Sequence, residues 1–269
     1  MHDESDEVLS HYQTIEEESR LRGGVGQIEF LRTQELLRRH LPPAPASILD
    51  VGGATGIHAR WLAETGYQVT LIDLALRHVE IASSTLAHLG VQVQQADARS
   101  LPAPSSSFDA VLLLGPLYHL QDSTDRLRAW REARRVVRSG GIVAGAAISR
   151  FASLFDGLAR GFLFDSEFQG IVREDLATGR HLNPNRRPGW FTTAYLHHPE
   201  ELPAEAEAAG LTVLELVGLE GLAGWLPFQE DRWDSPADRE TILGAARIVE
   251  NEPSLAGLSA HLLLVCELR

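Results

Sequence analysis

The pattern of apolar and polar positions switches repeatedly between two periods along the first half of the chain. Short apolar runs, as in buried strands, alternate with stretches that have the 3.6-residue period of an amphipathic helix. The expected strands span residues 47–51, 68–72, 91–95, 108–114 and 142–148, and the expected helices span residues 57–64, 75–89 and 123–138. Regular strand–helix alternation with short connections predicts an α/β fold with a doubly wound, mostly parallel sheet.

The regular pattern is interrupted twice. Residues 6–40 read as helical and end at a proline-rich break, and residues 150–198 are rich in Phe, Arg, Gly and Pro without a strand–helix unit. An interruption of about fifty residues inside a compact domain is usually a functional lid or cap. After it the pattern resumes with a helix near residues 199–209 and strands over 211–219 and 261–268.

These boundaries predict three parts. We expect an N-terminal helical lid over residues 1–40 and a cap insertion over residues 150–198. Residues 41–149 and 199–269 are expected to form a Rossmann-like core around a seven-stranded sheet.

The composition narrows the chemistry. With 44% apolar residues among 269, the chain can bury a sizeable core. All 24 basic residues are arginine, which excludes Schiff-base chemistry and the lysine of a phosphate-binding P-loop. The single cysteine, Cys266, excludes a disulfide framework and a cysteine metal cluster.

The charge argues against a nucleic-acid partner. The formal net charge is −13, whereas duplex binding needs clustered cations. The helix over residues 123–138 does carry arginines at spacings of three and four, but aromatic residues do not interleave beyond Trp130. We therefore expect an exposed helix face made of Arg126, Arg128, Arg131, Arg134, Arg135 and Arg138.

The sequence also bears on location. Residues 1–7 are acidic and contain no apolar run, which is the opposite of a signal peptide. The longest apolar runs are strand-sized and too short to cross a bilayer. We expect a cytoplasmic protein that does not engage a membrane, and the sequence does not predict its oligomeric state.

A glycine-rich turn after the first strand carries the strongest chemical signal. Glycines let the backbone approach a ligand closely, and the N-terminus of the following helix offers free N–H groups. A dinucleotide uses such a turn for its pyrophosphate, and S-adenosylmethionine uses it for its amino acid and ribose. The segment reads Ile48-Leu49-Asp50-Val51-Gly52-Gly53-Ala54-Thr55-Gly56.

This segment resembles motif I of the class I S-adenosylmethionine-dependent methyltransferases. Asp50, Gly52 and Gly56 match the motif, and Ala54 stands where the family has its middle glycine. The segment from Arg135 to Gly141 resembles a second family segment, with a serine in place of the family's proline. The resemblance covers residues 46–149 well and residues 199–269 weakly.

The resemblance implies S-adenosylmethionine as the cofactor, lying across the carboxyl ends of the first three strands. An acid about twenty residues after the glycines can bind both ribose hydroxyls, and an acid after the third strand can bind the adenine amino group. The implied cofactor-binding residues are Asp50, Gly52, Gly53, Ala54, Asp73, Leu74, Asp97, Ala98 and Leu114, with Tyr12 and Arg20 reaching in from the N-terminal helices.

Structural roles remain open for these acids. Asp50 could brace the turn by accepting backbone N–H bonds, and Asp73 could cap the helix that follows it. The two roles of Asp73 are compatible with each other.

Tyr118 and His119 are the catalytic candidates. They follow the fourth strand, and ligands of open α/β sheets bind beyond the carboxyl ends of the strands. We expect His119 to act as a general base and Tyr118 to orient it or hold the acceptor, because an imidazole titrates near neutrality. The alternative is that Tyr118 packs and His119 caps a helix. His181, His197 and His198 show no metal-ligand spacing and are expected to be solvated or structural, so no metal is predicted.

The favoured function is methyl transfer to an N, O or C nucleophile of a small molecule by in-line displacement. A sizeable cap on a minimal domain favours a bulky acceptor. One alternative is a nicotinamide-dependent oxidoreductase, whose G-x-G-x-x-G order fails because Gly52, Ala54 and Ile57 occupy its glycine positions. The other is a non-catalytic S-adenosylmethionine-binding protein.

Overall fold

The computed structural model describes residues 17–228 and 230–269, so Tyr12 lies outside the described residues. Its strands are β1 (Ser47–Val51), β2 (Gln68–Asp73), β3 (Gln92–Gln95), β4 (Phe108–Leu113), β5 (Val137–Ser149), β6 (Arg180–His181), β7 (Ala194–His197), β8 (Thr212–Gly218) and β9 (His261–Glu267). Its α-helices are α2 (Glu17–Arg22), α3 (Gly26–His40), α4 (Ile57–Glu64), α5 (Leu76–Leu86), α6 (Ser123–Val136), α7 (Ala152–Arg160), α8 (Ser166–Thr178), α9 (Glu201–Ala208), α10 (Glu230–Asp234) and α11 (Pro236–Val249).

The main sheet confirms the predicted Rossmann-like architecture. Strands β3, β2, β1, β4 and β5 pair in that order and run parallel. Strand β9 pairs antiparallel with both β5 and β8, and β7 pairs with the end of β5 and with β6, so the sheet of the described residues has nine strands and not the predicted seven. The order turns back between β1 and β4, and ligands of such sheets bind in the crevice at this switch point.

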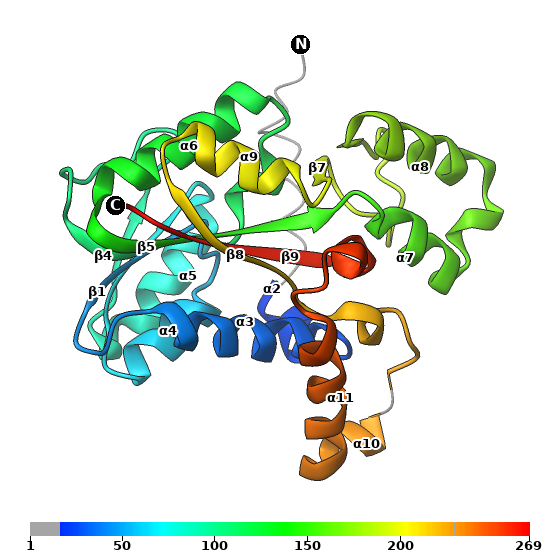
Figure 1. Cartoon of the computed structure of the whole chain (residues 1–269), viewed down its shortest axis with the longest axis horizontal. Coiled ribbons are helices and arrows are strands. Elements are labelled where there is room, and N and C mark those ends of the chain that lie inside the picture. The colour runs from blue at the N-terminus through cyan, green and yellow to red at the C-terminus, as the bar shows by residue number, and fades with distance from the viewer. Residues whose placement is uncertain (1–16, 229) are drawn as a thin grey trace.

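Helices cover both faces of the sheet (Figure 1). On one face α3, α4 and α5 pack against the strands, and on the other α6 and α9 do so. Strand β4 shows why its sequence is an unbroken apolar run: Ala110 and Leu112 face the first helical layer, whereas Val111 and Leu113 face the second. No helix in the described part of the chain is long and apolar enough to cross a membrane.

Two additional segments lie beyond the carboxyl end of β5. Residues 150–198 form α7, α8 and the short β6–β7 ribbon, whose strand β7 pairs with the last residues of β5 through Ile148 and Leu196. Residues 219–260 form a second helical segment, with α10 and α11, between β8 and β9. The apolar pattern did not reveal this second segment.

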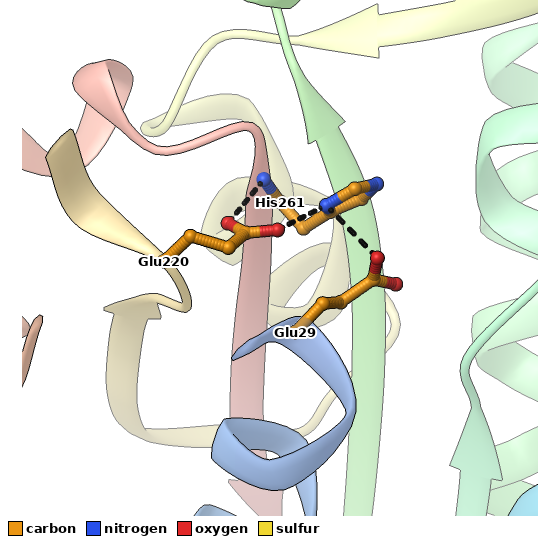
Figure 2. A group of neighbouring side chains, drawn as sticks. All are labelled: Glu29, Glu220 and His261. Carbon is orange, nitrogen blue, oxygen red and sulfur yellow. Dashed lines mark hydrogen bonds and ion pairs between the residues drawn. The ribbon is translucent and has the colours of Figure 1, made fainter. Parts of the chain in front are cut away.

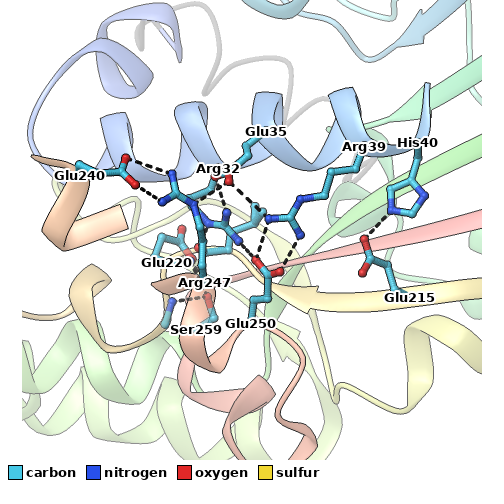
Figure 3. A network of polar contacts seen from close by, with 12 residues as sticks. Arg32, Glu35, Arg39, His40, Glu215, Glu220, Glu240, Arg247, Glu250 and Ser259 are labelled. Atoms are coloured by element: carbon cyan, nitrogen blue, oxygen red, sulfur yellow. Dashed lines mark hydrogen bonds and ion pairs between the residues drawn. The ribbon is translucent and has the colours of Figure 1, made fainter. Parts of the chain in front are cut away.

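A buried ionic network joins α3 to the second helical segment (Figure 3). Arg32 is fully buried, and its guanidinium contacts Glu250 and, at 2.5 Å, Glu35. Arg39 also donates to Glu250 at 2.6 Å, and Arg247 donates to Glu35 at 2.6 Å. A buried charge requires such partners, so the network fixes the position of α3 beside the sheet.

One arginine departs from the predicted exposed face of α6. Arg126 is buried because α6 packs against α9, where Glu205 accepts a hydrogen bond from its Nε at 2.7 Å. Its guanidinium also lies 3.6 Å from the ring centroid of Tyr195, a cation–π contact. The expectation of an exposed side chain was therefore wrong for Arg126.

Candidate active site

The turn after β1 is tightly packed at its first two glycines. Gly52 has φ +71°, and a Cβ there would lie 2.8 Å from Cδ of Pro116. A Cβ on Gly53 would lie 2.7 Å from Oδ2 of Asp50. Ala54 occupies the left-handed region with φ +48° despite its methyl group. The two glycines therefore allow close packing against Pro116 and Asp50, and Gly52, Gly53 and Ala54 line a cavity.

This strand-end cavity has a volume of about 170 Å³ and lies over the carboxyl ends of β1, β2 and β4. Every predicted site residue that the structure describes contributes to its wall. These residues are Arg20, Asp50, Gly52, Gly53, Ala54, Asp73, Leu74, Asp97, Ala98, Leu114, Tyr118 and His119.

Asp50 is a buried carboxylate that accepts no hydrogen bond from the described residues. Its relative exposure is 1%, and both side-chain oxygens lack a partner. Burial, assisted by the negative charge of Asp73, raises the pKa of Asp50 to about 7. A brace would accept backbone N–H bonds, so the described contacts do not give Asp50 that role. A buried polar group without a partner suggests a missing ligand.

Asp73 connects the ends of β1 and β2. Its Oδ2 accepts a hydrogen bond from the backbone N–H of Ala54 at 2.9 Å, and its Oδ1 accepts one from Ala75 at 2.8 Å. Nδ1 of His78 lies 3.1 Å from Oδ1. The structural role considered for Asp73 is thus present. A carboxylate has about four acceptor positions, so it retains capacity for ribose hydroxyls.

Asp97 is held by an arginine that the sequence did not indicate. Arg99 donates to it from Nη2 at 2.6 Å and from its backbone N–H at 2.8 Å, and its Nη1 reaches Asp125 at 2.7 Å. Burial opposes ionisation of Asp97, but the hydrogen bonds and charge of Arg99 outweigh it and lower the pKa. Arg99 itself lines the strand-end cavity.

Two histidines also lie in the wall of this cavity without having been predicted. His58 follows the glycine turn on α4, and His78 lies on α5. Burial lowers the pKa of His58 to about 4, so its imidazole is neutral near pH 7. Their position after the first two strands was the only available signal.

A second, large cavity of about 640 Å³ adjoins the first. Its apolar walls come mainly from the segment over residues 150–198, including Phe168, Trp190 and Phe191, and from Trp225. Arg20, Glu29 and Tyr118 line both cavities and therefore mark their junction.

The two catalytic candidates are placed differently. Tyr118 stands at the junction, whereas His119 lines the strand-end cavity but not the large one. The ring of His119 lies 4.7 Å from that of Tyr118 and 6.3 Å from that of Phe191.

Two of the other histidines are buried rather than solvated. His181 lines the large cavity, and its Nδ1 lies 2.8 Å from a carboxylate oxygen of Asp175. His197 is also buried, with its Nε2 3.4 Å from Glu205. Of the two roles expected for them, the structural one holds.

A further polar cluster borders the large cavity and was not predicted (Figure 2). Nδ1 of His261 lies 2.5 Å from Glu220 and 3.5 Å from Glu29. All three residues line the large cavity. Among the described residues, they form a group whose potential metal-ligating atoms lie within 4.8 Å of one another.

Comparison with known proteins identifies the sequence family. A family described as a methyltransferase domain matches residues 49–145. Methyltransferase GfsG of Streptomyces halstedii is 32% identical over 189 residues, which cover 68% of this chain and 59% of that protein. A ubiquinone biosynthesis O-methyltransferase of Xanthomonas axonopodis pv. citri (strain 306) is 33% identical over 124 residues, covering 45% and 51%. The chain spans about half to three fifths of the length of these relatives.

Solved structures share the fold at lower identity. A methyltransferase from Methanosarcina mazei superposes with a TM-score of 0.59 at 16% identity, covering 86% of this chain and 96% of that one. The [4+2]-cyclase SpnF superposes with a TM-score of 0.55 at 21% identity, covering 89% and 80%. The sequence match, the strand order and the glycine turn agree: residues 49–145 are a methyltransferase domain of the class I S-adenosylmethionine-dependent kind, whose cofactor is S-adenosylmethionine.

Proposed function

We propose that this chain transfers the methyl group of S-adenosylmethionine to a nucleophilic atom of a bulky, largely apolar small molecule bound in the large cavity. The observation that carries the proposal is the junction between the strand-end cavity and the large cavity. The two cavities share three wall residues, Arg20, Glu29 and Tyr118, so a cofactor in the first and an acceptor in the second would meet there.

The residues of the strand-end cavity suit this cofactor. The turn at Gly52, Gly53 and Ala54 lines the cavity, and Asp50 offers a buried carboxylate to the cofactor's amino group. Asp50, Asp73 and Asp97 together place three carboxylates around the cavity. Such a wall favours a cofactor with ammonium and sulfonium groups over one with a pyrophosphate, and the nicotinamide-dependent alternative is not favoured.

When bound, the cofactor supplies an electrophilic methyl group on a positively charged sulfur. The chain must then exclude water and hold the acceptor atom in line with the methyl group, so positioning dominates catalysis. We propose that Tyr118, which lines both cavities, holds the acceptor, and that His119, beside it on the strand-end side of the junction, is the base where a proton must leave.

The parts flanking the core close the site in this proposal. Residues 150–198 act as a cap over the acceptor, and the N-terminal segment over residues 1–40 acts as a lid through α2, since α3 is packed on the sheet. This assignment is supported by the aromatic side chains that residues 150–198 contribute to the wall of the large cavity, and by Arg20 of α2 in the same wall. Excluding water helps because a sulfonium reacts best with a desolvated nucleophile.

The acceptor class follows from the cavity rather than from the fold. Its walls are dominated by aromatic and aliphatic side chains, and some relatives are named as O-methyltransferases of ubiquinone biosynthesis. We infer an apolar acceptor that carries a hydroxyl or similar nucleophile.

A methyl-transfer screen tests the proposal. The chain is incubated with S-adenosylmethionine and a panel of hydroxylated aromatic and polyketide-like molecules, and acceptor-dependent formation of S-adenosylhomocysteine is measured. Ala152→Phe narrows the large cavity, so it should abolish turnover and leave S-adenosylhomocysteine affinity unchanged. Ala204→Phe, on the exposed side of α9, is the matched control and should be fully active.

Two outcomes would contradict the proposal. One is acceptor turnover that Ala152→Phe does not reduce. The other is binding of S-adenosylhomocysteine with no turnover on any acceptor, which would support the non-catalytic alternative. That alternative matters because the same fold occurs in a cyclase, and a fold does not define a reaction.

A further inference from the structure

His261 is the first residue of β9 and lies at the carboxyl edge of the sheet, opposite Ile148 of β5. Its backbone N–H donates to Oε2 of Glu220 at 3.1 Å, and its Nδ1 donates to Oε1 of the same residue at 2.5 Å. The Glu220 carboxylate is itself fixed by the hydroxyl of Ser259 at 2.7 Å. Glu220 therefore holds both the backbone and the imidazole of His261, and this fixes the orientation of the ring.

A second carboxylate approaches the same ring nitrogen. Oε2 of Glu29, in the first turn of α3, lies 3.5 Å from Nδ1 of His261. Glu29 also receives two hydrogen bonds from Arg20, at 2.6 and 3.0 Å. The charged groups facing His261 are thus Glu220, Glu29 and, behind Glu29, Arg20.

This surrounding keeps the imidazole charged. Burial alone would lower the pKa of His261, but the charges of Glu29 and Glu220 and the hydrogen bond to Glu220 raise it to about 9. Burial likewise opposes ionisation of Glu29, but Arg20 and His261 lower its pKa to about 2. At neutral pH both nitrogens of His261 carry protons.

The other ring nitrogen of His261, a residue of the large-cavity wall, has no carboxylate beside it. Nδ1 is directed at the two carboxylates, and Nε2 points away from both (Figure 2). Nε2 accepts or donates no hydrogen bond within the described ranges, and the side chain is 21% exposed in the cavity wall. Because Glu29 lies at the junction of the cavities, this N–H group stands near the place of methyl transfer.

We propose that His261 binds an anionic oxygen of the methyl acceptor through Nε2–H, so that the large cavity takes an apolar molecule bearing an acidic group such as a phenol, an enol or a carboxylic acid. The proposal rests on the proposed function, because it assigns the large cavity to the acceptor. A charged donor that is already oriented binds an oxyanion with little reorganisation. Glu29 and Glu220 are positioning residues that act through His261.

A divalent cation at the same cluster is the competing assignment. It would have to displace the proton from Nδ1 of His261 and compete with Arg20 for Glu29. Glu220 would also have to keep or exchange its hydrogen bonds from Ser259 and the His261 backbone. These existing partners make the protonated imidazole the better description.

Matched probes test the inference without knowledge of the natural acceptor. Binding of 2-naphthoate and of its neutral analogue 2-naphthamide is measured by calorimetry on the full chain, with and without S-adenosylhomocysteine. Naphthoate should bind at least tenfold more tightly than the amide at pH 7. His261→Gln should remove this preference, whereas His181→Gln, in the wall of the same cavity, should keep it.

The pH dependence of probe binding separates a binding role of His261 from a structural one. Naphthoate stays ionised, so its affinity should fall about tenfold between pH 8 and pH 10 as His261 loses its proton. In Glu220→Gln the fall should move to lower pH, because one of the charges that raise the pKa is gone.

Several outcomes would overturn the inference. They are equal binding of the two probes, a preference that survives His261→Gln, a flat pH profile, and micromolar binding of Mn²⁺ or Zn²⁺ that depends on His261. Failure of S-adenosylhomocysteine to bind would instead overturn the proposed function, because probe binding does not require methyl transfer.

Discussion

Replacing Asp50 with asparagine changes the free energy of unfolding in a pH-dependent way. Burial and the charge of Asp73 raise the pKa of Asp50 from 3.8 to about 7. Below the unfolded-state pKa of 3.8, Asp50 is protonated in both the folded and the unfolded chain, and its contribution to the free energy of unfolding is fully present. This contribution is lost as the pH rises through the folded-state pKa of about 7. Three pKa units correspond to about 4 kcal/mol lost by pH 8.

An asparagine at position 50 does not ionise, so the free energy of unfolding of this variant does not fall with pH through this group. In the absence of ligand, the free energy of unfolding of Asp50→Asn relative to the natural chain should increase by about 3 kcal/mol between pH 5 and pH 8. Urea denaturation at both pH values measures it. Asp109→Asn is the control, because burial raises the pKa of Asp109 less than its contacts with Ser47 and Arg138 lower it. Removing that charge should destabilise the protein at pH 8.

The same substitution should weaken cofactor binding. In the proposed complex Asp50 faces the ammonium group of S-adenosylmethionine and is ionised, so binding at pH 6 should release about one proton. Calorimetry in two buffers of different ionisation enthalpy counts this proton. Asp50→Asn should release none and bind at least about tenfold more weakly. A stability difference that does not vary with pH, or unchanged binding, would refute the reasoning.

Other predictions test neighbouring features. Asp73→Ala should weaken S-adenosylhomocysteine binding at least severalfold, since buried hydroxyls would lose a partner worth about 1–3 kcal/mol; unchanged affinity in calorimetry would contradict its role. Ala54→Gly should raise the free energy of unfolding by about 0.5–1 kcal/mol by relieving a left-handed backbone, and equal or lower stability in urea would argue against strain. His119→Ala should lower the turnover number at least about a hundredfold with cofactor affinity retained, whereas a loss below about threefold would make His119 structural. On adding S-adenosylhomocysteine, hydrogen exchange should slow in residues 150–198 or in α2, and no change in either would contradict the lid.

Local features of the site could be predicted because their signals are contiguous in the sequence. An apolar run, an acid and spaced glycines define β1 and its turn within nine residues, and the acids after β2 and β3 follow from the same strand order. Parallel strands end at one edge of a sheet, so these residues had to lie together.

The acceptor side could not be predicted in the same way. Glu29, Glu220 and His261 come from α3, the turn after β8 and the start of β9, and only tertiary packing brings them together. The helical segment between β8 and β9 carries mixed polarity that a strand–helix rhythm does not reveal. Arg126 was expected outside because its helical spacing does not show that α9 would cover it.

A crystal structure of the chain with S-adenosylhomocysteine tests the central claim most directly. The ligand should lie in the strand-end cavity, with its amino group at Asp50, its ribose hydroxyls at Asp73 and its adenine beside Asp97 and Ala98. Its sulfur should point towards the junction with the large cavity. A ligand bound elsewhere, or one whose sulfur faces away from that junction, would contradict the account.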